Sequence, residues 1–220
     1  MTTPCLWTSD AMATAMGAAT SGVLPDCITG ISIDSRTLQP GEAYFAIKGD
    51  VHDGHAFVGA ALAAGAALAV VARDKRDQFA ADAPLLIVDD VLDGLRDLAR
   101  AARARLAGRV IAVTGSVGKT STKEALRAVF AAQGETHASV ASFNNHWGVP
   151  LTLARCPASA RYAVFEIGMN HAGEIEKLVE MVRPHVAIIT TVEPVHLEFF
   201  DSVEGIADAK AEIFCAMEPG

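Results

Sequence analysis

A strand, a glycine-rich loop and a helix follow one another in the middle of the chain, and this order constrains the fold more than any other feature. Residues 110–113 read Val-Ile-Ala-Val, which is typical of a buried strand. The loop over residues 114–120 contains two glycines, and a helix is predicted over 119–132. A strand that turns through such a loop into a helix is half of a βαβ unit. We therefore predict an α/β fold with a parallel sheet.

Strands and helices alternate through the rest of the chain as well. The pattern predicts further strands over residues 28–33, 43–47, 67–71, 85–88, 162–167 and 186–191. It predicts further helices from a cap at residues 8–9 through residue 16, and over 56–64, 92–106, 174–182 and 203–217.

This alternation indicates two domains, with a boundary between residues 90 and 108. A small mixed α/β domain occupies residues 1–90, and a mostly parallel-sheet domain with the glycine loop occupies 91–220. The second sheet has only a few strands by residue 220. We therefore expect this domain to be incomplete and the chain to be the front part of a longer protein.

Composition narrows the class of protein. The net charge of −8 argues against non-specific nucleic-acid binding, although a local site can still be basic. The longest apolar stretch, residues 60–72, is too short to cross a bilayer, and the N-terminus lacks the features of a signal peptide. Four widely spaced cysteines form no metal motif and are expected to be reduced: Cys5, Cys27, Cys156 and Cys215. We predict a cytoplasmic protein without membrane insertion.

The glycine loop predicts a phosphate-binding site. Its backbone N–H groups and the following helix dipole favour an anion. Lys119 would reach the β- and γ-phosphates of ATP, and the Thr120 hydroxyl would bind Mg²⁺. The longest form of the motif needs glycine where the chain has Val113, so this is a shorter variant. A glycine turn with a surface lysine is the alternative, which the flanking strand and helix disfavour. The loop is Gly115-Ser116-Val117-Gly118-Lys119-Thr120-Ser121.

Other polar residues follow predicted strands and could complete such a site. Glu166 ends a strand, where a carboxylate can reach Mg²⁺, although an acid there can also be merely solvated. His196 follows the next strand, but a lone histidine is usually structural. Lys210 lies on an amphipathic helix, and the residues alone favour a solvated lysine. Asn144 and Asn145 offer amides to a substrate, or form a structural turn.

Taken in order, these segments resemble the Mur ligases. The ordered set is more specific than any single piece, and the resemblance runs from about residue 28 to the end. The segments in the second half are residues 114–121, 142–153, 165–174, 196–198 and 209–214. Residues 34–36, 41–49 and 53–55 resemble the uridine-nucleotide domain of the same family.

Within the family, the branch that adds D-alanyl-D-alanine to UDP-N-acetylmuramoyl-tripeptide is the most similar. The resemblance implies an ATP- and Mg²⁺-dependent amide ligase of peptidoglycan precursor synthesis, acting in the cytoplasm. In that reaction the γ-phosphate passes to the substrate carboxylate, and the dipeptide amine attacks the acyl phosphate. The two substrates are then the partners, and we expect a monomer.

The resemblance also implies roles for single residues. Lys119 contacts the phosphates and Thr120 and Glu166 bind Mg²⁺. His196 matches a histidine near a second Mg²⁺, and Lys210 matches a lysine that is carbamylated in many Mur ligases, so both enter the expected catalytic and metal sets. The residues matched to substrate contacts are Ser35, Arg36 and Lys48 in the front domain, and Asn144 and Asn145 in the second.

Departures from the family leave alternatives open. Mur ligases have three domains and about twice this length, so we expect the third domain to lie outside this sequence and little activity from this chain alone. A diamino-acid-adding Mur ligase is the main rival, and folylpolyglutamate synthetase shares the loop but lacks the front domain. A P-loop kinase or a GTPase is a further alternative, although no guanine-reading Asn-Lys-x-Asp segment is found. The last alternative is a non-catalytic module that binds a UDP-sugar or nucleotide.

Overall fold

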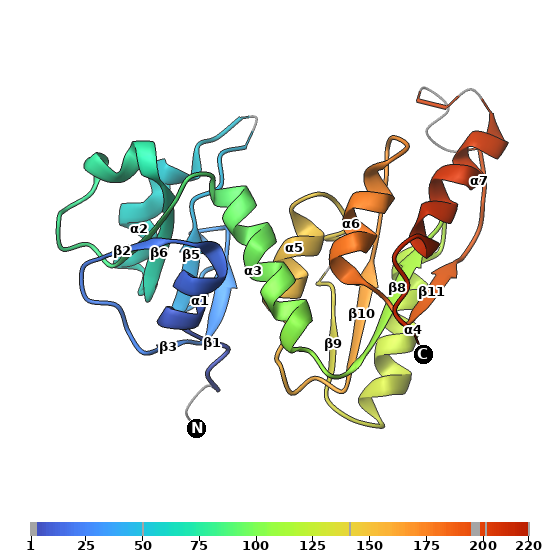
Figure 1. Cartoon of the computed structure of the whole chain (residues 1–220), viewed down its shortest axis with the longest axis horizontal. Helices are drawn as coiled ribbons and strands as arrows, with labels where there is room; N and C mark the ends of the chain where they lie inside the picture. The colour runs from blue at the N-terminus through green and yellow to red at the C-terminus, as the bar shows by residue number, and fades with distance from the viewer. Residues whose placement is uncertain (1–3, 50, 141, 195–198, 201, 220) are drawn as a thin grey trace. The chain divides into compact units, whose positions relative to one another are not determined.

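The computed structural model describes residues 4–49, 51–140, 142–194, 199–200 and 202–219 (Figure 1). The chain divides into two compact units, residues 1–101 and 102–220. The division falls inside helix α3 (Val91–Arg105), which the sequence predicts over 92–106. In the described part of the chain, no helix is both long and apolar enough to cross a membrane.

The first unit is built on a five-stranded mixed sheet. Its strand order is β2-β7-β6-β5-β4, with β2 antiparallel to β7 and the other neighbours parallel. A core that includes Tyr44, Val58, Ala69 and Leu85 lies against this sheet. The strands are β2 (Ala19–Ser21), β4 (Gly30–Ser32), β5 (Glu42–Phe45), β6 (Leu68–Ala72) and β7 (Leu85–Val88).

Short elements complete the first unit. A separate antiparallel pair joins β1 (Trp7–Thr8) to β3 (Cys27–Ile28). The helical segments are α1 (Ser9–Met16), the 3₁₀ turn η1 (Gly54–Phe57), α2 (Val58–Ala63) and the 3₁₀ turn η2 (Arg73–Gln78). The sequence predicts α1 and β7 with their observed ends, but it does not predict β1, β2 or η2.

Two predicted strands of this unit differ from the structure. The strand predicted over 28–33 is two strands, because β3 pairs with β1 whereas β4 pairs with β5, and Thr29 between them donates to Gly41 O at 3.0 Å. The strand predicted over 43–47 ends at Phe45, because the Ile47 N–H donates back to Phe45 O at 2.9 Å and turns the chain.

The second unit contains a four-stranded sheet, which confirms the predicted parallel arrangement. The order is β11-β8-β10-β9 and every neighbouring pair is parallel. Helix α4 (Lys119–Ala131) packs on the sheet face that carries Ile111, Val113 and Val164. The central strands are buried almost throughout, which explains their continuous apolar sequence. The strands are β8 (Arg109–Thr114), β9 (Thr136–Ala138), β10 (Tyr162–Glu166) and β11 (Val186–Ile189).

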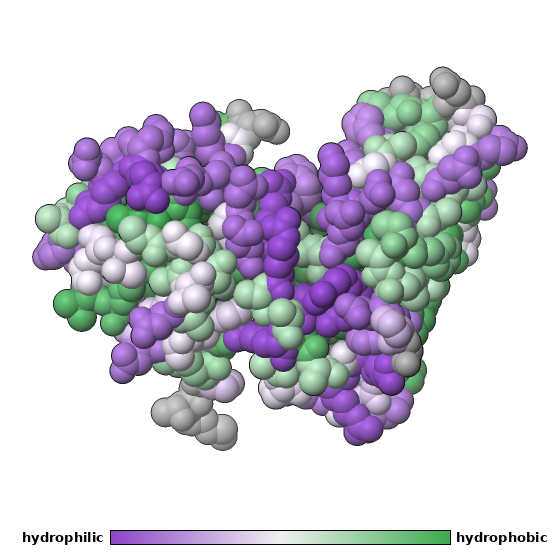
Figure 2. All heavy atoms as spheres, viewed as in Figure 1, coloured by the Kyte–Doolittle hydropathy of each residue, from purple (hydrophilic) through white to green (hydrophobic). Residues whose placement is uncertain are grey.

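The helices of the second unit are close to prediction, with two exceptions. The helix predicted over 203–217 ends early at Ala211 and continues only as a 3₁₀ turn, and α5 is not predicted at all. The Asn145 side chain accepts from the Gly148 N–H at 2.9 Å and so begins α5. The helical segments are α4 (Lys119–Ala131), α5 (Gly148–Ala154), α6 (Glu174–Val182), α7 (Val203–Ala211) and η3 (Glu212–Phe214). Figure 2 shows hydrophilic and hydrophobic residues interspersed over the visible face of each unit.

Candidate nucleotide-binding site

The loop between β8 and α4 has a backbone that only glycine adopts readily. Gly115 has φ of 143° and Gly118 has φ of 87°, both in the region that disfavours a side chain. A Cβ at Gly115 would also collide with the Thr190 hydroxyl. The two glycines therefore fix the path by which the loop reaches the N-terminus of α4.

The segment that follows β11 holds this loop in place. Thr190 donates from its N–H to Thr114 O at 2.9 Å and from its hydroxyl to Val117 O at 2.6 Å. The Ser116 N–H donates to Thr191 O at 2.9 Å. The sequence predicts a strand through residue 191, but β11 ends at Ile189 because the two threonines bind the loop instead. The loop is thus shaped by contacts within the chain itself.

Lys119 lies folded over the loop. Its ammonium group donates to Gly115 O at 2.7 Å and to Ser116 O at 3.4 Å. Burial lowers the pKa of Lys119, and the negative charge of Glu166 opposes that shift. A cation that is partly removed from water at the N-terminus of a helix is a suitable partner for a phosphate.

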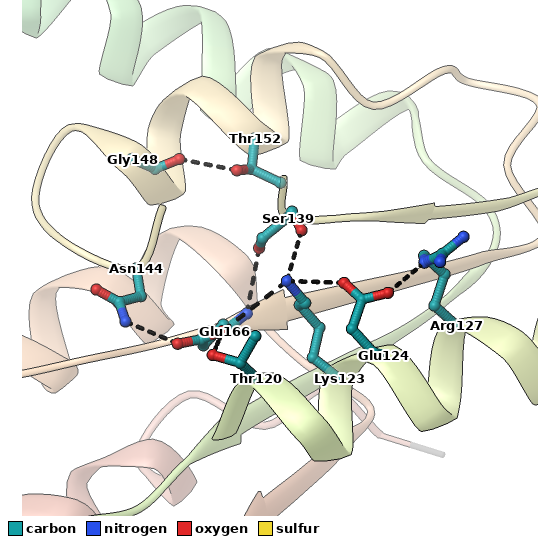
Figure 3. Close-up of polar contacts among 9 residues, drawn as sticks. All are labelled: Thr120, Lys123, Glu124, Arg127, Ser139, Asn144, Gly148, Thr152 and Glu166. Carbon is teal, nitrogen blue, oxygen red and sulfur yellow. Dashed lines mark hydrogen bonds and ion pairs between the residues drawn. The ribbon is translucent and has the colours of Figure 1, made fainter. Parts of the chain in front are cut away.

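Two predicted residues from separate segments, Thr120 and Asn144, meet at a third, Glu166 (Figure 3). Glu166 ends β10 and is 1% exposed. Its Oε2 accepts from the Thr120 hydroxyl at 2.9 Å, and its Oε1 accepts from the Asn144 amide at 2.8 Å. Because Glu166 is buried, the alternative of an acid that is merely solvated at the strand end is wrong. The structure therefore brings Thr120, Asn144 and Glu166 into one cluster.

The cluster fits Mg²⁺ in its chemistry. A hydroxyl and a carboxylate are hard oxygen ligands, and Mg²⁺ in proteins is commonly held by one or two carboxylates together with phosphates and water. Among the described residues, no group of three or more His, Cys, Asp or Glu side chains could hold a metal alone. Thr120 and Glu166 would thus bind Mg²⁺ together with the phosphates of a nucleotide and water.

Lys123 and Ser139 also belong to the cluster, and the sequence analysis missed both. The fully buried Lys123 ammonium group donates to Ser139 O at 2.8 Å and lies 4.0 Å from Glu166 Oε2. The Glu166 N–H donates to the Ser139 hydroxyl at 3.3 Å. Lys123 follows Thr120 by three residues on a predicted helix, so it had to share the helix face of Thr120. That spacing was the signal available in the sequence.

Lys210 is buried, which corrects the interpretation of a solvated lysine drawn from the residues alone. It lies in α7 and is 2% exposed. Burial, followed by the positive charge of Lys119, lowers its pKa to about 8. Glu212 holds this end of the helix, because its carboxylate accepts from the N–H groups of Gly173 at 2.7 Å and Glu176 at 3.1 Å. Lys210 is thus a buried amine whose pKa lies close to neutral pH, and the end of its helix is held in place by hydrogen bonds.

Two other predicted residues of this unit are Asn145 and His196. Asn145 uses its side chain to begin α5, rather than to contact Glu166. His196 lies outside the described residues. A substrate role for Asn145 and a metal role for His196 remain predictions.

The predicted substrate residues of the first unit are more exposed. Arg36 is 85% exposed and donates to the Asp34 carboxylate at 2.9 and 2.7 Å. Those hydrogen bonds lower the pKa of Asp34 to about 2. Ser35 is half-buried, and Lys48 is exposed and forms a backbone bridge with Asp53. Roles in substrate binding stay predictions for Ser35, Arg36 and Lys48.

The loop that contains Lys48 is fastened by a histidine. The buried His55 ring accepts from the Ala72 N–H at 2.9 Å through Nε2, so Nδ1 is left to donate to Asp53 at 2.6 Å. Asp53 also accepts from the His55 backbone N–H at 3.0 Å. The resemblance covered Asp53 and His55 without giving them this role.

Comparison with known proteins identifies both halves of the chain. The Mur ligase family catalytic domain matches residues 27–103, and the Mur ligase middle domain matches residues 113–220. The UDP-N-acetylmuramoyl-tripeptide–D-alanyl-D-alanine ligase of Rickettsia prowazekii is 36% identical over 95% of this chain and 45% of its own length. The ligase of that name from Bacillus subtilis is 40% identical over 84% of this chain and 40% of its own.

Solved structures agree with these matches. MurF from Acinetobacter baumannii superposes with a TM-score of 0.84 at 35% identity, over 97% of this chain and 47% of that one. MurF from Thermotoga maritima in complex with ADP has a TM-score of 0.72 at 30% identity, over 86% of this chain and 43% of that one. The chain thus spans less than half the length of these relatives.

Proposed function

The chain belongs to the Mur ligase family, and from that premise we propose that it supplies two parts of a UDP-N-acetylmuramoyl-tripeptide–D-alanyl-D-alanine ligase. Residues 1–90 bind the UDP-substrate, and residues 91–220 bind ATP. The enzyme acts as a monomer in the cytoplasm and takes part in peptidoglycan precursor synthesis. Relatives of that name, and a MurF structure with ADP, support the proposal.

In the proposed reaction, N–H groups at the N-terminus of α4 bind the ATP phosphates. Lys119 releases Gly115 O and turns its ammonium group to the transferring phosphoryl group. Thr120 and Glu166 would hold Mg²⁺, whose charge would stabilise that group. The γ-phosphoryl group passes to the peptide carboxylate, the D-alanyl-D-alanine amine attacks the acyl carbon, and phosphate leaves as the amide forms. The activated carboxyl group is what makes amide formation feasible.

Further residues of both units belong to the proposal. The lowered pKa of Lys210 favours a free amine, which can react with carbon dioxide to give a carbamate. That carbamate and His196 would complete the metal site. Ser35, Arg36 and Lys48 would contact the uridine nucleotide, while Asn144 and Asn145 would face the peptide substrate.

One observation carries the proposal. Thr120 and Glu166 are 46 positions apart, yet their oxygens are 2.9 Å apart at the carboxyl ends of the neighbouring strands β8 and β10. Ligands bind at this edge of open parallel sheets. The phosphate loop and a hard-metal carboxylate therefore meet where the fold binds ligands.

Calorimetry tests the proposal on this chain. We expect binding of MgATP and, separately, of UDP-N-acetylmuramoyl-tripeptide, with Thr120→Val abolishing the contribution of Mg²⁺ to ATP binding. A chain that binds neither ligand would contradict the proposed function. Binding of the UDP-substrate without ATP binding would favour a non-catalytic nucleotide-sugar module instead.

A further inference from the structure

We propose that Lys123 is a positioning residue that acts through Glu166. Its ammonium group is the counter-charge that keeps the buried Glu166 carboxylate ready for Mg²⁺ while no metal is bound. This role of Lys123 rests on the proposed function, because keeping the Glu166 carboxylate ready for Mg²⁺ matters only if MgATP binds. The pairing itself can be tested without any nucleotide.

The geometry sets Lys123 apart from the other groups around Glu166. Thr120 and Asn144 are neutral donors, and each satisfies one carboxylate oxygen. Lys123 lies 4.0 Å from Glu166 Oε2, which is too far for a hydrogen bond but close enough for charge compensation. Figure 3 shows Thr120 and Lys123 reaching Glu166 from the same helix, α4. Lys119 also interacts with Glu166 through its charge, but its ammonium group is hydrogen-bonded to Gly115 O and Ser116 O. Lys123 therefore supplies charge beside the carboxylate, where Thr120 and Asn144 supply hydrogen bonds.

Ser139 keeps the ammonium group at this position. Ser139 O accepts from Lys123 at 2.8 Å, and the Ser139 hydroxyl accepts from the Glu166 N–H at 3.3 Å. One residue thus binds the cation and the backbone of the residue that carries the anion. Lys123 and Glu166 are 0% and 1% exposed in their side chains, so bulk water does little to stabilise either charge.

The second carboxylate near Lys123, that of Glu124, depends less on the lysine for its stability. Glu124 lies 3.1 Å from the Lys123 ammonium group, but it is 44% exposed and pairs with Arg127 at 2.7 Å. An exposed carboxylate is stabilised by water, whereas a buried one is costly without a cation. Glu166 is therefore the partner whose stability depends on Lys123, and Glu124 serves as the natural control.

A double-mutant cycle tests the pairing in the absence of metal. The set comprises the wild type, Lys123→Met, Glu166→Gln and the double variant, and the measurement is the unfolding temperature in a chelator. We expect Lys123→Met to lower it by roughly 6 °C or more, because a buried carboxylate loses its cation. The double variant should unfold at a higher temperature than Lys123→Met, because the stranded charge has gone.

Mg²⁺ alone then separates positioning from a purely structural role. We expect millimolar MgCl₂ to raise the unfolding temperature of Lys123→Met by roughly 3 °C or more, because the ion replaces the missing cation beside Glu166. Neither the wild type nor the double variant should respond in this way. Two matched controls should behave like the wild type: Glu124→Gln, and Lys177→Met, which removes an exposed lysine of α6.

Several outcomes would overturn the inference. One is a double variant that unfolds at or below the temperature of Lys123→Met, which is the result expected if Lys123 only packs and binds Ser139 O. Another is a Lys123→Met variant whose unfolding temperature does not rise when Mg²⁺ is added. If Lys123→Met fails to fold, the double variant must still fold, and its failure also overturns the pairing. Absence of ATP binding by the wild type contradicts the proposed function and leaves this cycle readable.

Discussion

Two carboxylates at strand ends show how differently the two units of this chain build their polar sites. Asp34 follows β4 in the first unit, and Glu166 ends β10 in the second. Asp34 is bound by Arg36, two residues along the chain, and both are in contact with water. Glu166 is bound by Thr120 and Asn144, 46 and 22 positions away, and is buried.

The difference concerns what each contact can stabilise. A local, exposed ion pair is screened and contributes little to the fold. A buried carboxylate with several remote partners exists only when those segments have all folded around it. We therefore expect changes at Glu166 to have large effects and changes at Asp34 to have small ones, and the four predictions below test that contrast in order of size.

Glu166→Ala should have the largest effect. It removes the carboxylate proposed to hold Mg²⁺, so the affinity for MgATP measured by calorimetry should fall on the order of 100-fold or more. Asp34→Ala is the matched control and should bind MgATP like the wild type. Equal losses in the two variants would end the contrast between the two sites.

Arg103→Met should have the next largest effect. It allows a buried arginine to be compared with an exposed one. The buried Arg103 guanidinium donates to Val182 O at 2.7 Å and Arg183 O at 2.7 Å, and so caps the C-terminus of α6. Its loss leaves those carbonyls without their charged donor and should cost about 2–3 kcal/mol of unfolding free energy in urea. Arg36→Met, at an exposed position, should leave the urea midpoint in place. A matching shift in both variants would show that burial is not the deciding factor.

Lys210 should give a smaller effect that depends on pH. Its pKa is about 8 when folded and higher when unfolded, so the unfolded chain binds more protons between those values. Its contribution to stability should therefore rise by about 1–2 kcal/mol as the pH increases from about 8 to 10. Lys210→Met should remove that rise, and Lys48→Met, at an exposed position, should keep it. A rise of the same size in Lys210→Met would show that another group titrates.

Asp34→Asn should have the smallest effect. The lowered pKa of Asp34 means that its ion pair stabilises the fold above pH 4 and is lost as the pH falls toward about 2. Because the pair is exposed, the difference from the wild type at neutral pH should stay below about 0.5 kcal/mol. Urea unfolding at low and high salt measures it. A larger, salt-independent loss would place Asp34 in the same class as Glu166.

The parts of the fold that the sequence predicts well are those fixed by neighbouring residues. Helix α1 has a Thr8 cap that accepts from the Ala11 N–H at 3.2 Å and a left-handed Gly17 at its end. Helix α6 begins after Gly173 and stops before Pro184, as predicted. In both helices the signals lie within a few residues of the ends, so no knowledge of the tertiary structure is needed.

The parts that the sequence did not predict depend on distant partners. Strand β9 is three residues long and exists because it pairs with β10. The sequence predicts Thr190 and Thr191 as the end of a strand, because it does not reveal that their hydroxyl groups contact the glycine loop. The same holds in the site, where Thr120, Glu166 and Asn144 could be proposed singly from motifs. The burial of Lys123 and Lys210 follows only from packing.

The attachment of the glycine loop to Thr190 and Thr191 has a consequence for the order of events during synthesis. The loop leaves the ribosome more than 70 residues before the segment that fixes it. Closing a loop of that length costs chain entropy, which the pairing of strands β8 and β11 helps to offset. A nascent chain that stops short of residue 190 would carry the whole phosphate-binding motif and still lack its shape. We therefore expect nucleotide affinity to arise late and abruptly as the chain lengthens.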